Sequence, residues 1–264
     1  MIALVVIVSL LAPVICSQSS TIGTAPSLLP LGSSGHLLGT AVLGRDQLTR
    51  LLFGARPLLF TSASAVSIAV LVGTTLGMVA GFAQRLTETV ILRLLDVLLS
   101  FPLFLFGIVV IAALGPGIVN LAAAIAVALT PVVARLAHGL TLRESSRDYV
   151  LAARSVGMRP ARIMVREILP NIAGPVVVQA TSLFALAAGF STALSYLGLG
   201  VIPPTPDWGL MVRDGQEFII NAPALAVIPG MCITVFLVAV TFVGDALRDR
   251  LDPDRRLAVG VVGR

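Results

Sequence analysis

The sequence is poor in charge, and one basic residue type is missing altogether. It contains no lysine, so all eighteen basic residues are arginine, and charged residues make up only 12% of its 264 positions. A soluble domain usually carries about twice that charged fraction. The apolar excess, with 57% hydrophobic residues and a mean hydropathy of +1.01, indicates a chain whose surroundings are largely lipid.

Other scarcities exclude whole classes of function. Cys16 and Cys232 are too few for a disulfide framework and have no metal-ligand spacing, so no metal site is expected. No catalytic set of Asp, Glu or Ser converges with His36 or His138, which argues against an enzyme. The chain has no P-loop, so no nucleotide cofactor is expected on it. Its arginines stand between apolar runs rather than on a basic face, so nucleic-acid binding is not expected either.

Six apolar runs predict an all-α membrane protein with six transmembrane helices in a single domain, 1–264. A crossing needs about 20 apolar residues. The runs lie at about 2–16, 58–82, 94–114, 118–137, 175–197 and 223–244. The first run is short, but it has no basic flank and no clear small-x-small cleavage site. An uncleaved span is therefore favoured over a signal peptide, which stays open as the alternative.

The distribution of arginine predicts the orientation of these spans. With the N-terminus in the cytoplasm, only Arg45, Arg50, Arg56 and Arg213 lie in outer segments, and the other fourteen lie in inner ones. Because short cytoplasmic loops carry the excess of basic residues, both termini are predicted to be cytoplasmic. The segments 17–57 and 198–222 are then outside, and the long loop 138–174 is inside.

The inner loop has the pattern of a helix, a glycine and a second helix. The first helix presents the small residues Ala152 and Ala153, and Gly157 permits a chain reversal that residues with a Cβ resist. A short amphipathic helix follows, and Pro170 is expected to end it. Such a helix pair fits a groove on a partner protein. The alternative is a basic loop that lies on anionic headgroups.

Two further patterns concern the spans themselves. Gly73, Gly77 and Gly81 are each four residues apart, so they form one helical stripe along which a neighbouring helix can approach closely. The sequence does not say whether that neighbour is in this chain or another. Asp96 is an exception among spans nearly free of charge. Arg93 shares its helical face, which predicts an interfacial ion pair, with a polar gate residue as the alternative.

The inner loop resembles the EAA loop of ABC importer permeases, the cytoplasmic helix pair that docks on the ATPase subunit. Ala152, Ala153, Gly157, Leu169 and Pro170 stand at the motif positions, whereas Leu151 stands where the family usually has a glutamate. The resemblance implies an ATPase-coupling loop that comprises Leu151, Ala152, Ala153, Arg154, Gly157, Arg162, Leu169 and Pro170.

Three more segments resemble the C-type permease subunit of the dipeptide, oligopeptide and nickel subfamily. They are residues 39–56, residues 194–209 with their Leu-Ser-Tyr-Leu-Gly run, and the tail from Gly244 to Pro253. Ser191 is a departure, because relatives commonly have a glutamate at that position. The resemblance covers residues 36–253 and implies the type I ABC importer permease fold, with six spans and a cytoplasmic coupling helix pair.

The resemblance implies the membrane-spanning subunit of an ATP-driven importer that moves di- and oligopeptides across the bacterial inner membrane. Its implied partners are a second homologous permease, two ABC ATPase subunits or one fused pair that hold ATP and Mg, and an extracytoplasmic substrate-binding protein. The two outer loops are the expected contact with the binding protein, through Arg45, Asp46, Pro204 and Trp208. For Trp208 a place in the aromatic belt at the membrane surface is an equal alternative.

Three other functions stay in view. A permease of the same kind could carry nickel or another small solute. A secondary transporter or channel usually places charged or broken-helix sites at mid-membrane, and the spans show no charges there. A membrane-embedded enzyme would need a convergent catalytic set, which the sequence does not supply.

The predicted topology can be tested with a reporter that is active only outside the cytoplasm. Fused after residue 264, it is expected to be inactive, because the arginine distribution places the C-terminus inside. A fusion within 198–222 is the matched control and is expected to be active. Activity of the C-terminal fusion would reject the topology.

Overall fold

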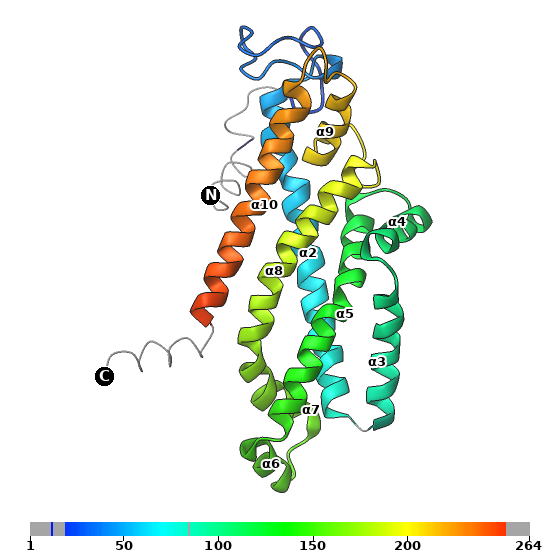
Figure 1. The fold of residues 1–264 in the computed structure, drawn as a ribbon, viewed down its shortest axis with the longest axis vertical. Coiled ribbons are helices and arrows are strands. Elements are labelled where there is room, and N and C mark those ends of the chain that lie inside the picture. Colours follow the sequence, from blue (N-terminus) through cyan, green and yellow to red (C-terminus); the bar gives the residue numbers. More distant parts are fainter. Residues whose placement is uncertain (1–11, 13–18, 84, 252–264) are drawn as a thin grey trace, which may run out of the picture. The chain divides into compact units, whose positions relative to one another are not determined.

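The computed structural model describes residues 12, 19–83 and 85–251, and these fold as helices joined by turns and loops. The predicted first span, except Ala12, and the tail after Leu251 lie outside the described residues. The elements (Figure 1) are, in chain order, η1 (Val42–Gly44), α2 (Gln47–Phe82), α3 (Arg85–Ser100), α4 (Leu103–Leu114), α5 (Ile118–Ser145), α6 (Asp148–Ser155), α7 (Pro160–Ile163), η2 (Met164–Ile168), α8 (Leu169–Tyr196), α9 (Trp208–Gln216) and α10 (Ala224–Leu251).

The chain divides into two compact units. The first unit holds the chain up to Ala65, Phe104–Ile125 and Ala185–Val240. The second unit holds Val66–Leu103, Ala126–Phe184 and the chain from Thr241. α9 belongs to the first unit, and α3, α6 and α7 belong to the second, whereas α2, α5, α8 and α10 contribute residues to both.

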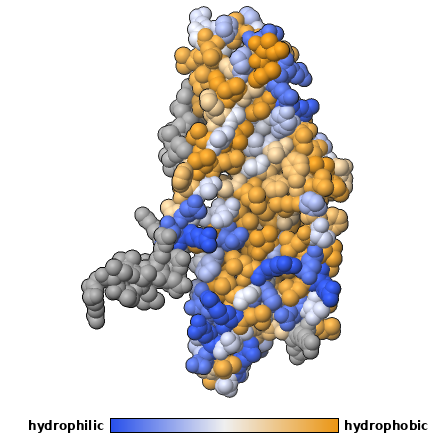
Figure 2. Space-filling model, viewed as in Figure 1, coloured by the Kyte–Doolittle hydropathy of each residue, from blue (hydrophilic) through white to orange (hydrophobic). Residues whose placement is uncertain are grey.

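Four helical runs of the described residues are long and apolar enough to cross a membrane. They are Gln47–Phe82, Ile118–Ser145, Pro160–Tyr196 and Ala224–Asp249, and they overlap four of the predicted spans. Large apolar side chains stay exposed along them, and Figure 2 shows hydrophobic residues over much of one face of the molecule. Since water would penalise such a surface, it is expected to face lipid or other membrane helices.

α2 begins well before the predicted span at 58–82. Asp46 stands just ahead of it, and Asp46 Oδ2 accepts hydrogen bonds from the backbone N–H of Thr49 at 2.8 Å and from its hydroxyl at 2.7 Å. This cap satisfies a free N–H of the first turn. The 36 residues of α2 rise about 1.5 Å each, which gives about 54 Å. The hydrocarbon core is about 30 Å thick, so part of α2 extends beyond it.

The predicted span at 94–114 is not one continuous helix. α3 ends at Ser100, α4 begins at Leu103, and the two are bent by 91° at the break. Pro102 explains the break, because it has no N–H to donate and it disfavours the helical conformation at Phe101. The pair makes a fifth crossing only if it is counted as one broken span.

Pro170 does not end the second loop helix, contrary to the prediction. Helical structure runs on from Pro160 to Tyr196. A π-helical turn, η2, comes just before Pro170, and in it the Leu169 N–H bonds the Met164 C=O. A proline ring normally clashes with the carbonyl four residues earlier. The wider π turn gives the ring room at that position, so the helix continues.

The glycine stripe of α2 packs against α5 of the same chain. A Cβ added at Gly73, Gly77 or Gly81 would come within 2.8 Å of an atom of α5. The closest approach is at Gly77, where the added Cβ would lie 2.4 Å from the carbonyl oxygen of Ala134. The two backbones therefore touch along this stripe, as small residues allow.

Asp96 pairs with α5 and not with Arg93, contrary to the prediction. Arg135 Nη2 donates to Asp96 Oδ1, and His138 Nε2 lies 2.9 Å from Glu88 Oε1. The acidic side chains of α3 thus face α5, while several of its large apolar side chains are exposed. Spacing along one helix predicted the wrong partner, because the cation that pairs with Asp96 comes from the neighbouring helix α5.

The glycine contact predicts a steep cost for bulk at Gly77. Gly77→Leu is expected to destabilise the protein by about 1–3 kcal/mol or more, because the added side chain would overlap the α5 backbone. Thermal unfolding in detergent measures the loss, with uptake assayed beside it. Gly139→Leu on α5 is the control, because a Cβ there meets nothing within 4 Å. Equal behaviour of the two variants would contradict the contact.

Candidate functional site

The segment from α6 to α7 turns on a glycine with a left-handed backbone. Gly157 has φ +75°, directly after the last residues of α6. Its N–H bonds the Arg154 C=O at 3.0 Å, and the Met158 N–H bonds the Ala153 C=O at 3.1 Å. These two bonds form a Schellman motif, which closes a helix and favours glycine at this position. The predicted helix–glycine–helix is therefore present.

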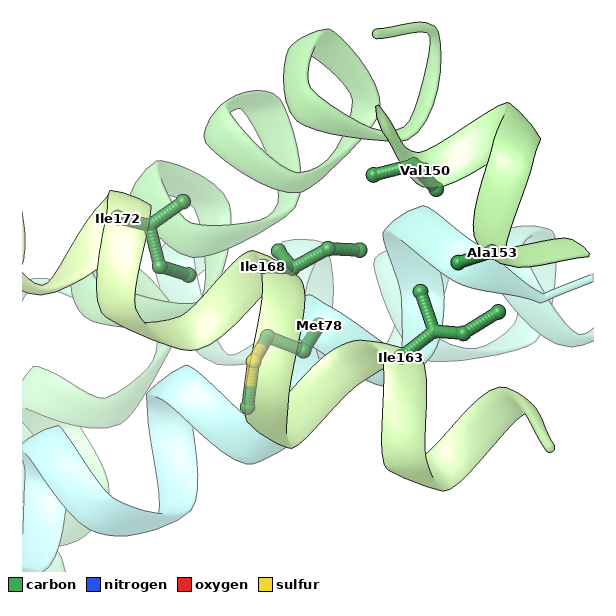
Figure 3. Packing of buried hydrophobic residues seen from close by; sticks show 6 residues of the cluster. All are labelled: Met78, Val150, Ala153, Ile163, Ile168 and Ile172. Carbon is green, nitrogen blue, oxygen red and sulfur yellow. The ribbon is translucent and has the colours of Figure 1, made fainter. Parts of the chain in front are cut away.

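Beneath this turn lies a buried apolar cluster, the loop core. Its members are Met78, Val150, Ala153, Ile163, Ile168 and Ile172. They come from α2, α6, α7, η2 and α8, and Figure 3 shows their side chains directed toward one another. Val150 and Ile168 have no exposed surface at all. The loop is thus fixed by burial against membrane helices of the second unit.

Two polar contacts add to the loop core. The Arg154 guanidinium lies over the Phe82 ring, 4.3 Å from its centroid, so a cation–π contact joins α6 to the end of α2. The Tyr149 hydroxyl donates to Glu144 Oε2 at 2.7 Å. Partial burial and this hydrogen bond raise the pKa of Tyr149 to about 12. The hydroxyl therefore keeps its proton, and the bond, at neutral pH.

The predicted coupling residues fall into two groups. Ala153 is buried and Leu169 is partly buried, and both pack in or against the loop core. The others present an exposed surface, and they are Leu151, Ala152, Arg154, Gly157, Arg162 and Pro170. Val156, which is 80% exposed, adds an apolar group that the sequence reasoning missed. The buried coupling residues thus hold the exposed coupling residues in place.

Charge surrounds this exposed surface. Arg143, Arg147, Arg159 and Arg166 are exposed in addition to the two arginines already named. Glu144, in contrast, is almost fully buried. The surface that the segment offers to a partner is therefore mainly cationic with an apolar centre at Leu151 and Val156.

In the first unit, most of the predicted outer-face residues are buried. Arg45 and Asp46 are less than a tenth exposed, and the Asp46 carboxylate caps α2 and bonds His36 Nδ1 at 2.9 Å. Trp208 is 5% exposed, and its Nε1 donates to the Leu51 C=O at 2.7 Å. These side chains hold the unit together rather than cover its surface. Of the four predicted residues, only Pro204 is exposed.

A buried arginine ties α2 to α9. Arg50 is 1% exposed, and its Nη2 lies 3.6 Å from Asp214 Oδ2. Gln47 Nε2 donates to the Leu225 C=O at 3.3 Å, which joins α2 to α10 as well. Asp207 caps α9 through the Leu210 N–H, and burial raises the pKa of Asp207 to about 6. Loop 198–222 is therefore a packed part of the first unit.

Ser191, the departure from the family pattern, is buried on α8. It is 1% exposed, and its hydroxyl has no hydrogen-bond partner among the residues that the structure describes. Within the described residues, no group of three His, Cys, Asp or Glu side chains lies close enough to hold a metal ion.

A family model matches residues 73–257. Its description is binding-protein-dependent transport system inner membrane component. The chain belongs to this family. It is the membrane-spanning permease subunit of an ABC importer, a multi-pass inner-membrane component that is not itself catalytic. The resemblance inferred from the loop and its flanking segments is thereby confirmed.

Curated relatives agree with this assignment. The chain is 42% identical, over 87% of its length and 76% of the relative, to the di/tripeptide transport system permease protein DppC of Pseudomonas aeruginosa. It is 37% identical, over 94% of its own length and 82% of the relative, to the dipeptide transport system permease protein DppC of Alkalihalophilus pseudofirmus. It is 38% identical, over 84% and 73%, to the glutathione transport system permease protein GsiD of Pectobacterium atrosepticum.

Solved structures share the fold at low sequence identity. An inward-facing structure of the MetNI methionine ABC transporter matches with a TM-score of 0.63 and 16% identity, over 78% of this chain and 97% of that one. An amino acid ABC transporter solved with histidines matches with a TM-score of 0.58 and 18% identity, over 77% and 94%. The type I permease fold class predicted from the sequence is confirmed.

The neighbouring alanines of α6 give a matched test of the loop core. Ala153→Leu is expected to lower stability by about 1–3 kcal/mol, because the added atoms overfill a packed core. Ala152→Leu lies on the exposed side and is expected to stay within about 0.5 kcal/mol of the parent. Thermal unfolding of the purified proteins compares them. Equal stabilities would show that the two positions do not differ in packing.

Proposed function

We propose that this permease moves peptides across the inner membrane, driven by an ATPase that docks on the exposed surface between α6 and η2. The observation that carries the proposal is the loop core. It joins the exposed residues on α6 to Met78 of α2 and Ile172 of α8, with no flexible linker between them. A displacement of the loop is therefore transmitted directly to two membrane helices.

The docking surface has the features of a partner interface. It combines exposed apolar side chains, Leu151 and Val156, with a surrounding set of arginines. The protein has no nucleotide motif of its own, so ATP and Mg would be held by two ATPase subunits or one fused pair. ATP binding there would favour one of two arrangements of the loop and its helices, which is how a partner's ligand biases a transporter.

The peptide substrate is supported by the relatives. Three of them, at 36–42% identity, are named as di/tripeptide or dipeptide permeases, and a fourth is named for glutathione, itself a short peptide. We infer the same class of cargo here. A second, homologous permease would complete the pathway. The excess of arginine in the predicted inner segments supports an orientation with both termini in the cytoplasm.

The extracytoplasmic binding protein would contact the first unit. Because Arg45, Asp46 and Trp208 are buried, the contact falls to the exposed run Ile202, Pro203, Pro204 and Thr205. This run stands on a base fixed by the Trp208 and Asp207 bonds. An exposed loop on a fixed base is suited to contact a soluble protein that delivers substrate.

Gly157 offers the sharpest test of the docking surface. Gly157→Glu adds bulk, negative charge and left-handed strain of about 1–2 kcal/mol to an exposed turn, where an added Cβ meets nothing in the chain itself. The spans keep their hydrophobic length, so membrane insertion is expected to survive. The expected result is a normal protein level, loss of ATPase in a pull-down, and loss of peptide uptake.

Gly157→Asn is the matched control. Asparagine tolerates the left-handed conformation and adds no charge, so ATPase capture and uptake should remain near the parent level. If Gly157→Glu is well expressed and still captures ATPase and imports peptide, the docking assignment is wrong.

A further inference from the structure

The docking segment meets α5 at a short non-helical joint. α5 ends at Ser145 and α6 begins at Asp148, so Ser146 and Arg147 connect the two helices. Arg147 has an extended backbone, with φ −75° and ψ 148°. Its N–H bonds the Glu144 C=O at 3.1 Å, which closes the turn. Residues at the ends of helices are where a chain can bend, so this joint needs a restraint if α6 is to keep its direction.

A side-chain hydrogen bond spans the joint. The Tyr149 hydroxyl of α6 donates to Glu144 Oε2 of α5 at 2.7 Å. The other carboxylate oxygen, Oε1, lies 3.8 Å from Arg143 Nε. Glu144 is only 9% exposed, and a buried carboxylate is costly unless such partners satisfy it. The bond therefore ties the first turn of α6 to the last turn of α5.

The same hydroxyl also joins α6 to α8. Asn171 Nδ2 donates to the Tyr149 hydroxyl oxygen at 3.2 Å and to the Glu167 C=O at 2.6 Å. A hydroxyl can accept one hydrogen bond while it donates another, so Tyr149 serves both neighbours at once. The bonds from Asn171 through Tyr149 to Glu144 form the joint chain, which crosses three helices of the second unit.

The loop core alone leaves the tilt of α6 free. α6 contributes Val150 and Ala153 to it, which are three residues apart and hence lie on one face. Apolar contacts are non-directional, so a helix of two turns can rock about them. The contact of Arg154 with Phe82 restrains the C-terminal end of α6. The joint chain restrains the N-terminal end with hydrogen bonds, which are directional.

We propose that the Tyr149 hydroxyl fixes the tilt of α6 against α5 and α8, so that a docked ATPase displaces these membrane helices instead of rocking α6. This inference rests on the proposed ATPase docking, and it adds a positioning residue outside the coupling motif. Without the hydroxyl, α6 bends at Ser146 and Arg147 when the ATPase moves. ATP is then still hydrolysed, but less of the motion reaches the spans.

The test measures ATP hydrolysis and dialanine uptake in the same vesicles, which hold the complete importer with its binding protein. Tyr149→Phe keeps the ring and removes the hydroxyl, so ATPase capture and the rate of ATP hydrolysis should stay near the parent level. A hydrogen bond to a charged group shifts an equilibrium by roughly tenfold or more, so dialanine uptake per ATP should fall about tenfold.

Tyr196→Phe is the matched control. It also removes a hydroxyl that donates to a side chain, Gln216, but it lies in the first unit and away from the joint chain. It is expected to leave dialanine uptake per ATP unchanged. Pull-down of the ATPase accompanies each measurement, so assembly and coupling are read separately.

Variants of Glu144 separate the hydrogen bond from the charge of the carboxylate. Glu144→Gln keeps an oxygen that can accept from Tyr149, so it should retain most of the parent's uptake per ATP. Glu144→Leu has no acceptor and should match Tyr149→Phe. The double variant of Tyr149→Phe with Glu144→Leu should be no worse than either single variant, because two residues that act through one bond are not additive.

Each outcome decides the proposal. A fall in uptake per ATP in Tyr149→Phe, with assembly intact and with Glu144→Gln close to the parent, supports it. An unchanged uptake per ATP overturns it, even if less importer assembles, because the hydroxyl then serves stability alone. Equal losses in Glu144→Gln and Glu144→Leu, or additive losses in the double variant, also overturn it. If the unsubstituted chain captures no ATPase or imports no dialanine, that arm overturns the proposed function and this inference with it.

Discussion

The packing of Met78 against the isoleucines of the loop is the contact on which the rest of this permease depends. An exposed loop is ordinarily the least constrained part of a membrane protein. Here the inner face of the loop is as buried as a protein core, because Val150, Ile163 and Ile168 are almost completely buried. Interiors packed in this way transmit displacement instead of absorbing it. The proposed docking surface, the turn at Gly157 and the start of α8 are therefore packed together with the end of α2.

Gly157, Pro102 and Pro170 are residues of the kind that can end a helix, and each has a different effect here. The local structure around each residue decides whether the helix ends. Gly157 closes a helix through a Schellman motif. Pro102 separates α3 from α4. Pro170 interrupts nothing, because a π turn precedes it. The rule that a proline ends a helix correctly describes an isolated segment. The rule fails at Pro170, because the wider π turn before it leaves room for the proline ring within a continuous helix.

Long apolar runs and the glycine-turn motif were readable from the sequence because each depends on local chemistry. The family assignment followed from the motif at Ala152, Ala153, Gly157, Leu169 and Pro170. What could not be read is which residues meet across helices. Arg135 as the partner of Asp96, Met78 in the loop core, and the buried state of Trp208 and Asp46 all depend on how distant segments pack. The composition of 17–57 and 198–222 resembles that of exposed loops, and only tertiary contacts such as Arg50 with Asp214 show that some of their polar residues are buried.

The glycine contact between α2 and α5 has a consequence for how the second unit can move. The two backbones approach closely at three successive glycines, and such close packing opposes a relative shift of the two helices. α2 and α5 are therefore expected to move together from Gly73 to Gly81. Any hinge that opens or closes this permease must lie outside that stretch. The non-helical residues Phe101 and Pro102 lie outside it.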